Sequence, residues 1–266
     1  KVLKVGRVQT PTLAMLVDRE CKIMNFKKEA YYVAHLLGNG MDAVSEHIGD
    51  KTEAERLAGA CINGQALVTA VVKEEKCIAP PRLYDLTTLQ RDANRLFGFT
   101  AKQTLEYTQS LYEKKLVTYP RTDSQYLSDD MEGTARNVIE AIFNSLLSEQ
   151  DILFNTDVKK VLNSKKVTDL HAIIPTIEIV KQDLKAIPES ERKILSLCAN
   201  RLLCATAEKH IYHSTRAELT CNGMVFKVSG KEIWKNGFLS RCCIRIWIFC
   251  RHWRYLRIIM KAVGRN

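Results

Sequence analysis

The chain has 266 residues, of which 46% are hydrophobic and 26% charged, so it is long enough to bury one large core or two modest ones. No apolar run approaches the roughly 20 residues that cross a bilayer, and the first residues do not resemble a signal peptide, which argues against membrane-spanning and secreted classes. The net charge of +10 suggests a polyanionic partner, but residues 240–266 carry six Arg, one Lys and no acidic residue, so most of the excess belongs to this tail.

The N-terminal part of the chain is predicted to alternate between helix and strand. Thr10 is a plausible helix N-cap and Pro11 occupies the tolerated first helical position, so a helix is expected to begin there. A strand is predicted at 31–37, a short helix at 52–61 and a further β-rich segment at 66–73. This pattern predicts a mixed α and β fold.

The middle of the chain changes character and becomes helical. A helix is predicted at 85–97, where apolar residues recur at helical spacing and Gly98 follows as a stop. Thr100 opens a second helix with a possible capping box. The segment 116–119 is expected to be extended, because Pro120 disfavours a helical conformation in the residue before it. Two helices leading into a short strand resemble a winged helix-turn-helix, which frequently contacts DNA.

The last third is predicted to hold a long helix and a hairpin. Apolar residues at helical spacing predict an amphipathic helix over 189–210, with Arg201 interrupting its buried stripe. A packed stem with a solvated head is the preferred interpretation of Arg201, ahead of a DNA contact. Strands are predicted at 211–221 and 224–228, joined by Asn222-Gly223, which is a strong hairpin signal.

Tyr119 and Arg121 are the candidate chemical pair of the extended segment. A phenol with a pKa of about 10 is only about 0.1% ionised at neutral pH, so a nucleophilic tyrosine needs a cation beside it. Arg121 lies two positions on, which in a strand places both side chains on one face, and its planar fork suits two phosphate oxygens. Asp123 and Ser124 are candidates for orienting the loop. Taken alone, these residues also fit a strand-end tyrosine beside a solvated arginine.

Three short stretches carry a resemblance to a known family. They are residues 6–13 (GRVQTPTL), 118–124 (TYPRTDS) and 171–176 (HAIIPT), and residues 81–90 look like the entry to the family's catalytic-tyrosine domain. In this order and at these separations, the chain resembles the type IA DNA topoisomerases, particularly the topoisomerase III-like enzymes of bacteria. The resemblance spans about residues 5–239, and three ordered motifs are far more specific than any one of them.

The resemblance implies a reaction and a set of site residues. Tyr119 would attack a phosphodiester of single-stranded DNA, leaving a 5′-phosphotyrosyl link and a free 3′-hydroxyl. Another strand would pass through the break before religation, without ATP. Arg121 matches the family's arginine that positions the scissile phosphate, and Arg7 and Gln9 match residues that border the single-strand groove. A plain capped helix is the alternative interpretation of the segment that holds Arg7 and Gln9.

Two departures from the family pattern bear on activity. Relatives usually carry His-His or His-Glu ahead of the Ala-Ile run, and the first His contacts the phosphate. Here Leu170 occupies that position, with His171 beside it, so His171 is a candidate DNA contact with a structural histidine as the alternative. The family also has an N-terminal Toprim domain that supplies acidic Mg²⁺ ligands and a general-acid Glu, which have no counterpart upstream of Tyr119. The chain is therefore expected to be truncated and inactive alone, with Mg²⁺ required by the full family enzyme.

The resemblance implies a domain layout as well. A helical winged-helix-like tyrosine domain at 82–167 would be inserted in a β-rich gate domain made of 26–81 and 168–239, and residues 1–25 would belong to a groove-forming helical domain. The resemblance ends before the tail at 240–266. Translation out of frame is the preferred explanation of this tail, and a basic amphipathic segment for a membrane or a nucleic acid is the other.

Other functional classes have weaker support. Nine scattered cysteines without a C-x-x-C pair argue against zinc and favour reduced thiols in the cytoplasm. His210 and His213 lack a third metal ligand at suitable spacing, and a tyrosine recombinase would need its tyrosine near the C-terminus. The remaining competitor is a non-catalytic remnant that holds single-stranded DNA electrostatically and through backbone contacts.

Overall fold

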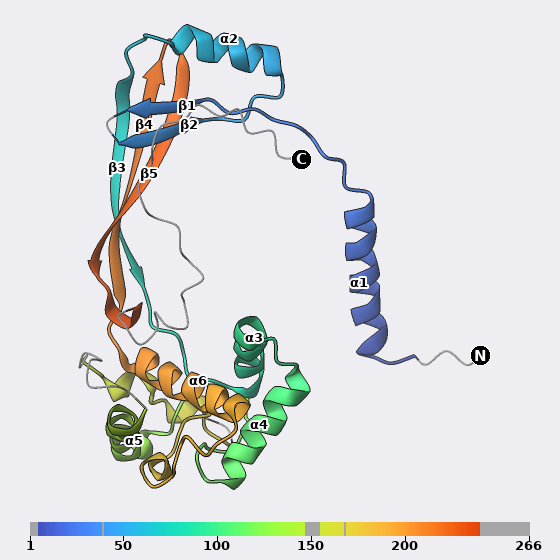
Figure 1. The fold of residues 1–266 in the computed structure, drawn as a ribbon, viewed down its shortest axis with the longest axis vertical. Helices are drawn as coiled ribbons and strands as arrows, with labels where there is room; N and C mark the ends of the chain where they lie inside the picture. The colour runs from blue at the N-terminus through green and yellow to red at the C-terminus, as the bar shows by residue number, and fades with distance from the viewer. Residues whose placement is uncertain (1–4, 39, 147–154, 168, 240–266) are drawn as a thin grey trace. The chain divides into compact units, whose positions relative to one another are not determined.

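The computed structural model describes residues 5–38, 40–146, 155–167 and 169–239, so the basic tail at 240–266 lies outside the described residues. Helices and strands alternate along the chain, which confirms the mixed α and β class (Figure 1). The chain divides into two compact units: unit 1 comprises Lys1–Val72 and Arg216–Ser229, and unit 2 comprises Lys73–Thr215 and the described residues from Gly230 onward.

Unit 1 is built on an antiparallel sheet. The full sheet has five strands in the order β1-β2-β5-β4-β3, and β3, β4 and β5 each contribute residues to both units. The strands are β1 (His35–Gly38), β2 (Met41–Ser45), β3 (Leu67–Ile78), β4 (His210–Cys221) and β5 (Met224–Lys235). The strand predicted at 31–37 is shorter than expected, because Tyr32 forms only an isolated bridge with Ile48 ahead of β1.

A small core closes unit 1. Helix α2 (Lys51–Cys61) begins at the N-cap Asp50, whose carboxylate accepts a hydrogen bond from the backbone N–H of Glu53. Its partly buried residues Leu57 and Cys61 pack against five buried side chains of the sheet: Ala43, Leu219, Cys221, Met224 and Phe226. Such burial of apolar surface is what holds this sheet together.

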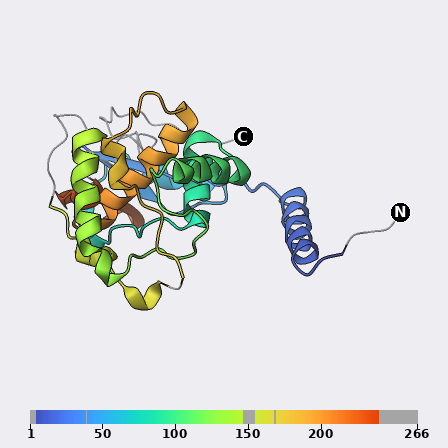
Figure 2. The same ribbon diagram turned by 90° about the horizontal axis from the view of Figure 1, so that it is seen from below.

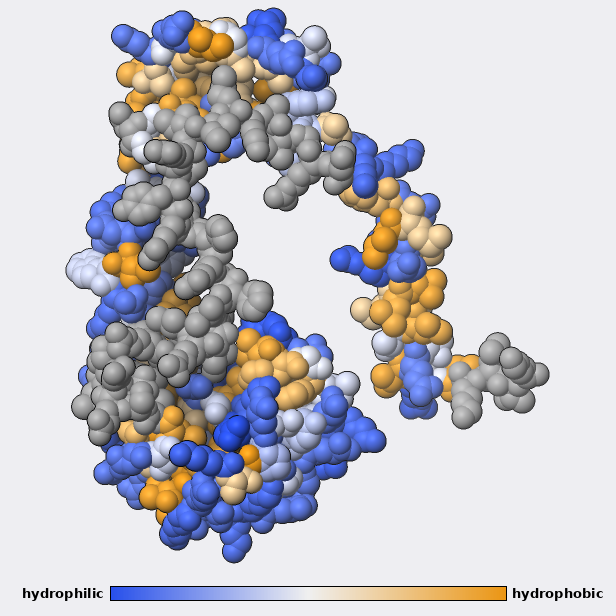
Figure 3. Space-filling view, viewed as in Figure 1, coloured by the Kyte–Doolittle hydropathy of each residue, from blue (hydrophilic) through white to orange (hydrophobic). Residues whose placement is uncertain are grey.

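Helix α1 (Gln9–Met24) buries none of its residues. The expected N-cap at Thr10 is wrong: the first helical bonds form a turn earlier, with the N–H of Thr10 donating to the carbonyl of Gly6 at 3.1 Å. The Thr10 hydroxyl instead accepts from the Gly6 N–H at 3.3 Å. Because α1 buries no residue, the hydrophobic side chains along it are exposed (Figure 3).

The hairpin between β4 and β5 confirms the turn predicted from Asn222-Gly223. Both residues have left-handed backbones, with φ of 46° at Asn222 and 84° at Gly223. This pair of angles suits a two-residue turn whose twist matches that of the flanking strands. Asn222 is also fixed by its side-chain amide, which donates to the carbonyl of Ala60 at 2.6 Å.

The described part of unit 2 gathers four α-helices around a large apolar core. They are α3 (Leu86–Phe97), α4 (Ala101–Glu113), α5 (Glu132–Ser145) and α6 (Glu189–Thr206), and α6 contacts each of the other three (Figure 2). The residues predicted for the buried side of α6, such as Ile194, Cys198 and Leu202, are each 0% exposed. None of the helices described is long and apolar enough to cross a membrane.

The starts of α3 and α4 follow their local sequences. Asp85 caps α3 in a reciprocal capping box with Thr88, and Gly98 ends the helix with a φ of 72°. Thr100 caps α4 in a second capping box with Gln103. These bonds satisfy backbone N–H groups that a helix start otherwise leaves without partners, so both boundaries were predictable.

Helix α6 ends earlier than the predicted 210, at Thr206. The Thr206 carbonyl accepts from the backbone N–H of Asp157 at 2.7 Å, and Ala207 adopts an extended backbone. The chain then enters β4 at His210. A partner from a distant part of the sequence therefore replaces the helical bonds that periodicity alone would continue.

Candidate active site

The tyrosine motif follows directly from the end of α4. Lys115 leaves the helix in a left-handed conformation with a φ of 61°. The N–H of Leu116 returns to the carbonyl of Leu111 at 2.8 Å, which closes the helix end. Leu116 and Val117 are then buried at 0% and 1% exposure. Two anchored apolar residues therefore set the position from which Tyr119 projects.

The segment that carries Tyr119 pairs with the segment that carries His171. Val117 bridges Pro175 in antiparallel orientation, and the N–H of Thr118 donates to the carbonyl of Ile174 at 2.9 Å. The Thr118 hydroxyl accepts from the N–H of Ile174 at 3.0 Å and donates to the carbonyl of Ala172 at 3.1 Å. Two motifs that lie far apart in the sequence are thereby held side by side, since Thr118 and Ala172 are 54 positions apart.

An open depression of about 570 Å³ lies where these segments meet. Tyr119 is half-buried in its wall, and its ring meets that of Tyr112 edge to face with centroids 5.2 Å apart. The other lining residues include two acids, a lysine and a histidine: Glu113, Lys115, Val117, Thr118, His171, Thr176 and Glu178. The predicted residues Tyr119 and His171 therefore share one site.

His171 has a defined tautomer in this arrangement. Its Nδ1 lies 2.8 Å from the carbonyl oxygen of Ala172, which can only accept, so Nδ1 carries a hydrogen. The neighbouring Leu170 is 37% exposed, and its carbonyl accepts from the Thr122 hydroxyl at 3.0 Å. A leucine side chain cannot donate to phosphate, so His171 is the polar side chain of this pair that lines the depression.

Arg121 is placed differently from Tyr119. It is exposed and is not among the residues that line the depression, so its pairing with the tyrosine stays a prediction. Ser124 is buried at 4% exposure and donates to the carbonyl of Lys166 at 3.1 Å. Its hydroxyl also accepts from the N–H of Tyr126 at 3.2 Å, so Ser124 organises the loop after the motif. Asp123 is exposed.

Arg7 and Gln9 belong to the opposite unit from Tyr119 and are both exposed. Gln9 is the first residue of α1, and the helix has no side-chain cap at its N-terminus. Backbone N–H groups at such a helix start suit phosphate oxygens. The assignment of Arg7 and Gln9 as DNA contacts remains a prediction.

The described residues do not gather a metal site. Nowhere in that part of the chain do three or more His, Cys, Asp or Glu side chains come close enough to hold a metal ion. His210 directs Nδ1 to the carbonyl of Asn236 at 3.2 Å, while the Nε2 of His213 lies 3.7 Å from a carboxylate oxygen of Glu75. The two histidines therefore have separate partners.

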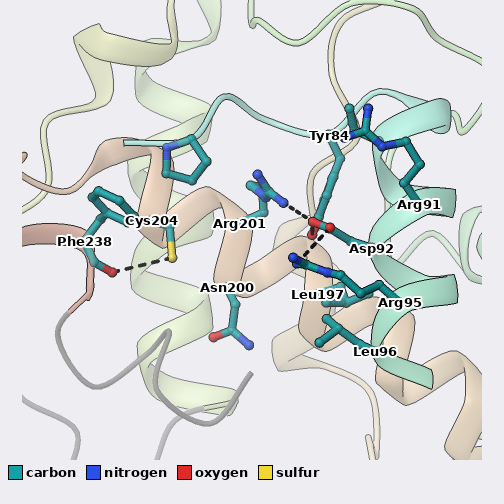
Figure 4. A pocket seen from close by; sticks show the side chains of 12 residues that line it. Tyr84, Arg91, Asp92, Arg95, Leu96, Leu197, Asn200, Arg201, Cys204 and Phe238 are labelled. Carbon is teal, nitrogen blue, oxygen red and sulfur yellow. Dashed lines mark hydrogen bonds and ion pairs between the residues drawn. The ribbon is translucent and has the colours of Figure 1, made fainter. Parts of the chain in front are cut away.

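A second site, between α3 and α6 in unit 2, was missed by sequence reasoning (Figure 4). Arg201, expected to have a solvated head, forms an ion pair with Asp92, and both side chains are only 20% exposed. The guanidinium also lies 4.0 Å from the centre of the Tyr84 ring, and burial raises the pKa of that phenol. Asp92 and Arg201 are 109 positions apart, so nothing local in the sequence could have revealed the pair.

The comparisons with known proteins agree on one family. A DNA topoisomerase family model matches residues 1–242. DNA topoisomerase 3 of Bacillus licheniformis is 38% identical over 253 residues, which is 89% of this chain and 34% of the relative. DNA topoisomerase 3 of Bacillus subtilis is 37% identical over 251 residues, again with 89% and 34% covered. The chain thus spans about a third of the length of the relatives it matches.

A solved structure shows the same fold. The full-length topoisomerase I of Thermotoga maritima superposes with a TM-score of 0.69 at 24% sequence identity. The match covers 99% of this chain and 43% of that one. At this level of identity the comparison concerns the fold alone.

Proposed function

Because the chain belongs to the type IA DNA topoisomerase family, we propose that Tyr119 is the nucleophile of a reversible transesterification on single-stranded DNA. The observation that carries this proposal is the shared depression, which is lined by both Tyr119 and His171 from two separate motifs. A phosphodiester is its proposed occupant. The open wall leaves the half-buried phenol accessible to a substrate rather than sealed in the core.

The proposed step exchanges one phosphodiester for another. The Tyr119 phenol loses its proton, its Oη attacks phosphorus, and the new Oη–P bond forms as the P–O3′ bond breaks. The departing O3′ takes up a proton and becomes a 3′-hydroxyl, while the DNA 5′ end stays linked to the tyrosine. The reverse attack by the 3′-hydroxyl restores the strand, so the bond energy is retained and ATP is not needed.

Positive charge near the phenol would lower the barrier to this step. Lys115 supplies a positive charge to the same depression, which the acids Glu113 and Glu178 also line. Such a positive charge stabilises both the phenolate and the charge that grows on the attacked phosphate. Arg121, two residues on, is proposed to close over the phosphate when DNA binds, since its exposed guanidinium is able to move.

The wider layout belongs to the same proposal. The helical residues 82–167 would form a winged-helix-like tyrosine domain inserted between gate segments 26–81 and 168–239, and residues 1–25 would border the single-strand groove through Arg7 and Gln9. DNA is the proposed partner and the cytoplasm the proposed location. The family resemblance implies Mg²⁺, but the described residues do not fit a site for it, and no step above is assigned to a metal.

A covalent trapping assay tests the proposal. The chain is incubated with single-stranded DNA labelled at its 3′ end, which stays on the fragment linked to the tyrosine. The mixture is quenched with detergent, and the labelled protein is counted after electrophoresis. We expect a weak adduct that disappears in Tyr119→Phe, weak because Leu170 stands where relatives place a phosphate-contacting histidine. Saturable DNA binding without any adduct would favour the second candidate, a non-catalytic single-strand-binding protein. Relaxation of supercoiled DNA by this chain alone would contradict the expected low activity.

A further inference from the structure

The pocket between α3 and α6 has a volume of about 280 Å³ and is separate from the tyrosine depression, since no residue lines both. Arg91 and Arg95 enter it from α3, where a spacing of four residues places them on one helix face. Asn200 and Arg201 enter it from α6 (Figure 4). Two helices therefore contribute polar side chains to the lining of this pocket.

The charge of the pocket is positive. Among the residues that the structure describes, three arginines and a single acid, Asp92, line it. That carboxylate is already shared, because it pairs with Arg201, lies 3.0 Å from Arg95 and accepts from the Tyr84 hydroxyl at 2.8 Å. Among the described residues, no hydrogen bond or ion pair involves Arg91. The lining thus retains an excess of positive charge.

Most of the remaining wall is apolar. Pro81, Leu96, Leu197, Cys204 and Phe238 form it, and the polar Thr88 is the other described residue of the lining. Pockets for drug-sized ligands usually start at about 300 Å³, so a pocket of about 280 Å³ suits a single nucleotide unit rather than a dinucleotide. Arginine forks bind tetrahedral phosphate oxygens in pairs, and an apolar wall suits the sugar or base attached to that phosphate.

We propose that the α3–α6 pocket is a phosphate-binding site that holds one nucleotide unit, with Arg91 and Arg95 on the phosphate and the apolar wall against its sugar or base. Arg201 and Asp92 hold the α6 side of the site in place. The phosphate belongs either to a free mononucleotide or to a DNA backbone that reaches this unit away from Tyr119. The proposal does not rest on the cleavage chemistry.

Isothermal titration calorimetry of the full chain tests the site with inorganic phosphate, dAMP and an eight-nucleotide oligothymidylate. The test variant combines Arg91→Gln and Arg95→Gln. The control combines Arg56→Gln and Arg136→Gln, which together remove the same two positive charges from exposed ion pairs on α2 and α5, outside the pocket. We expect the test variant to bind at least tenfold more weakly and the control to bind like the unmodified chain. In the test variant Asp92 still accepts from the Tyr84 hydroxyl and pairs with Arg201. If the double variant does not fold, Arg91→Gln alone is used as the test variant.

Each outcome either supports or overturns the proposed site, or identifies the phosphate as that of a free nucleotide or of a DNA backbone. Binding of dAMP that is lost in the test variant assigns a free nucleotide. Binding of the oligonucleotide alone, with a salt-dependence slope smaller by about 0.7 in Arg91→Gln, assigns a backbone phosphate. Equal affinities in the unmodified chain and the test variant, or no saturable binding of any probe, overturn the site. Retained pocket binding in Tyr119→Phe separates this result from a failure of the cleavage proposal.

Discussion

The ring of Tyr112 stands edge to face against the ring of Tyr119, with an interplanar angle of 77° and centroids 5.2 Å apart. Tyr112 is 40% exposed, so the pair lies at the surface, at the wall of the depression. The last turn of α4 thereby holds the proposed nucleophile in one orientation. A held ring loses less freedom when the phosphate arrives.

The coupling between these two rings is measurable. In a double-mutant cycle of Tyr112→Ala and Tyr119→Ala, urea denaturation is expected to give a coupling energy of about 0.5–1 kcal/mol, the usual value of an aromatic pair. Tyr31→Ala, which removes a tyrosine that stacks on His47 in unit 1, is the control and should show no coupling to Tyr119→Ala. A coupling near zero between Tyr112 and Tyr119 would show that the rings do not support one another.

Thr118 is expected to be essential for holding the two motifs together. Thr118→Val keeps the shape but leaves the N–H of Ile174 and the carbonyl of Ala172 without the hydroxyl that each bonds at about 3 Å. Both residues are buried, so a loss of about 1–3 kcal/mol in unfolding free energy is expected. The exposed Thr69 makes one bond, to the carbonyl of Glu218, and Thr69→Val should cost under about 0.5 kcal/mol. Equal losses in the two variants would argue against the proposed role of Thr118.

The Asp92–Arg201 pair should contribute through its burial. Asp92→Asn leaves the Arg201 guanidinium, whose side chain is 20% exposed, without its anionic partner, so thermal and chemical denaturation should show a loss of about 2 kcal/mol. The exposed pair of Asp18 and Lys22 provides the comparison, and Asp18→Asn should change stability by less than about 0.5 kcal/mol. An Asp92→Asn variant with unchanged stability would mean that water solvates the Arg201 guanidinium in place of the lost carboxylate.

Gly223 is required by its backbone rather than by space. No atom lies within 4 Å of a Cβ added there, but its φ of 84° is one that other residues rarely adopt. Gly223→Ala should therefore lower the free energy of unfolding by about 1–2 kcal/mol. Gly230, on β5, is equally open and has no positive φ, so Gly230→Ala should be neutral or stabilising by about 0.5 kcal/mol. A stabilising Gly223→Ala would contradict the turn geometry.

Cys198 should resist alkylation. Burial raises its pKa to about 12, and its side chain is 0% exposed, so almost no thiolate forms at pH 8 and no reagent reaches it. Cys21 and Cys77 are exposed and free, and they should react with iodoacetamide under the same conditions. Peptide mass spectrometry before and after urea unfolding measures the difference. Labelling of Cys198 in the folded chain at the rate of Cys77 would be incompatible with the packed α6.

Local sequence determined several features without help from the fold. The capping boxes that start at Asp85 and Thr100 and the turn at Asn222-Gly223 were all predictable, because their hydrogen bonds and backbone angles involve residues within three positions of one another. The ordered motifs likewise identified the family and the candidate Tyr119.

Tertiary packing decided the rest. Only the fold brings Tyr119 and His171 into one depression and leaves Arg121 outside its lining. The fold also ends α6 at Thr206 and pairs Arg201 with Asp92. Each of these outcomes depends on a partner tens of residues or more away in the chain. Periodicity describes which face of an element is apolar, but it carries no information about which distant polar group that face will meet.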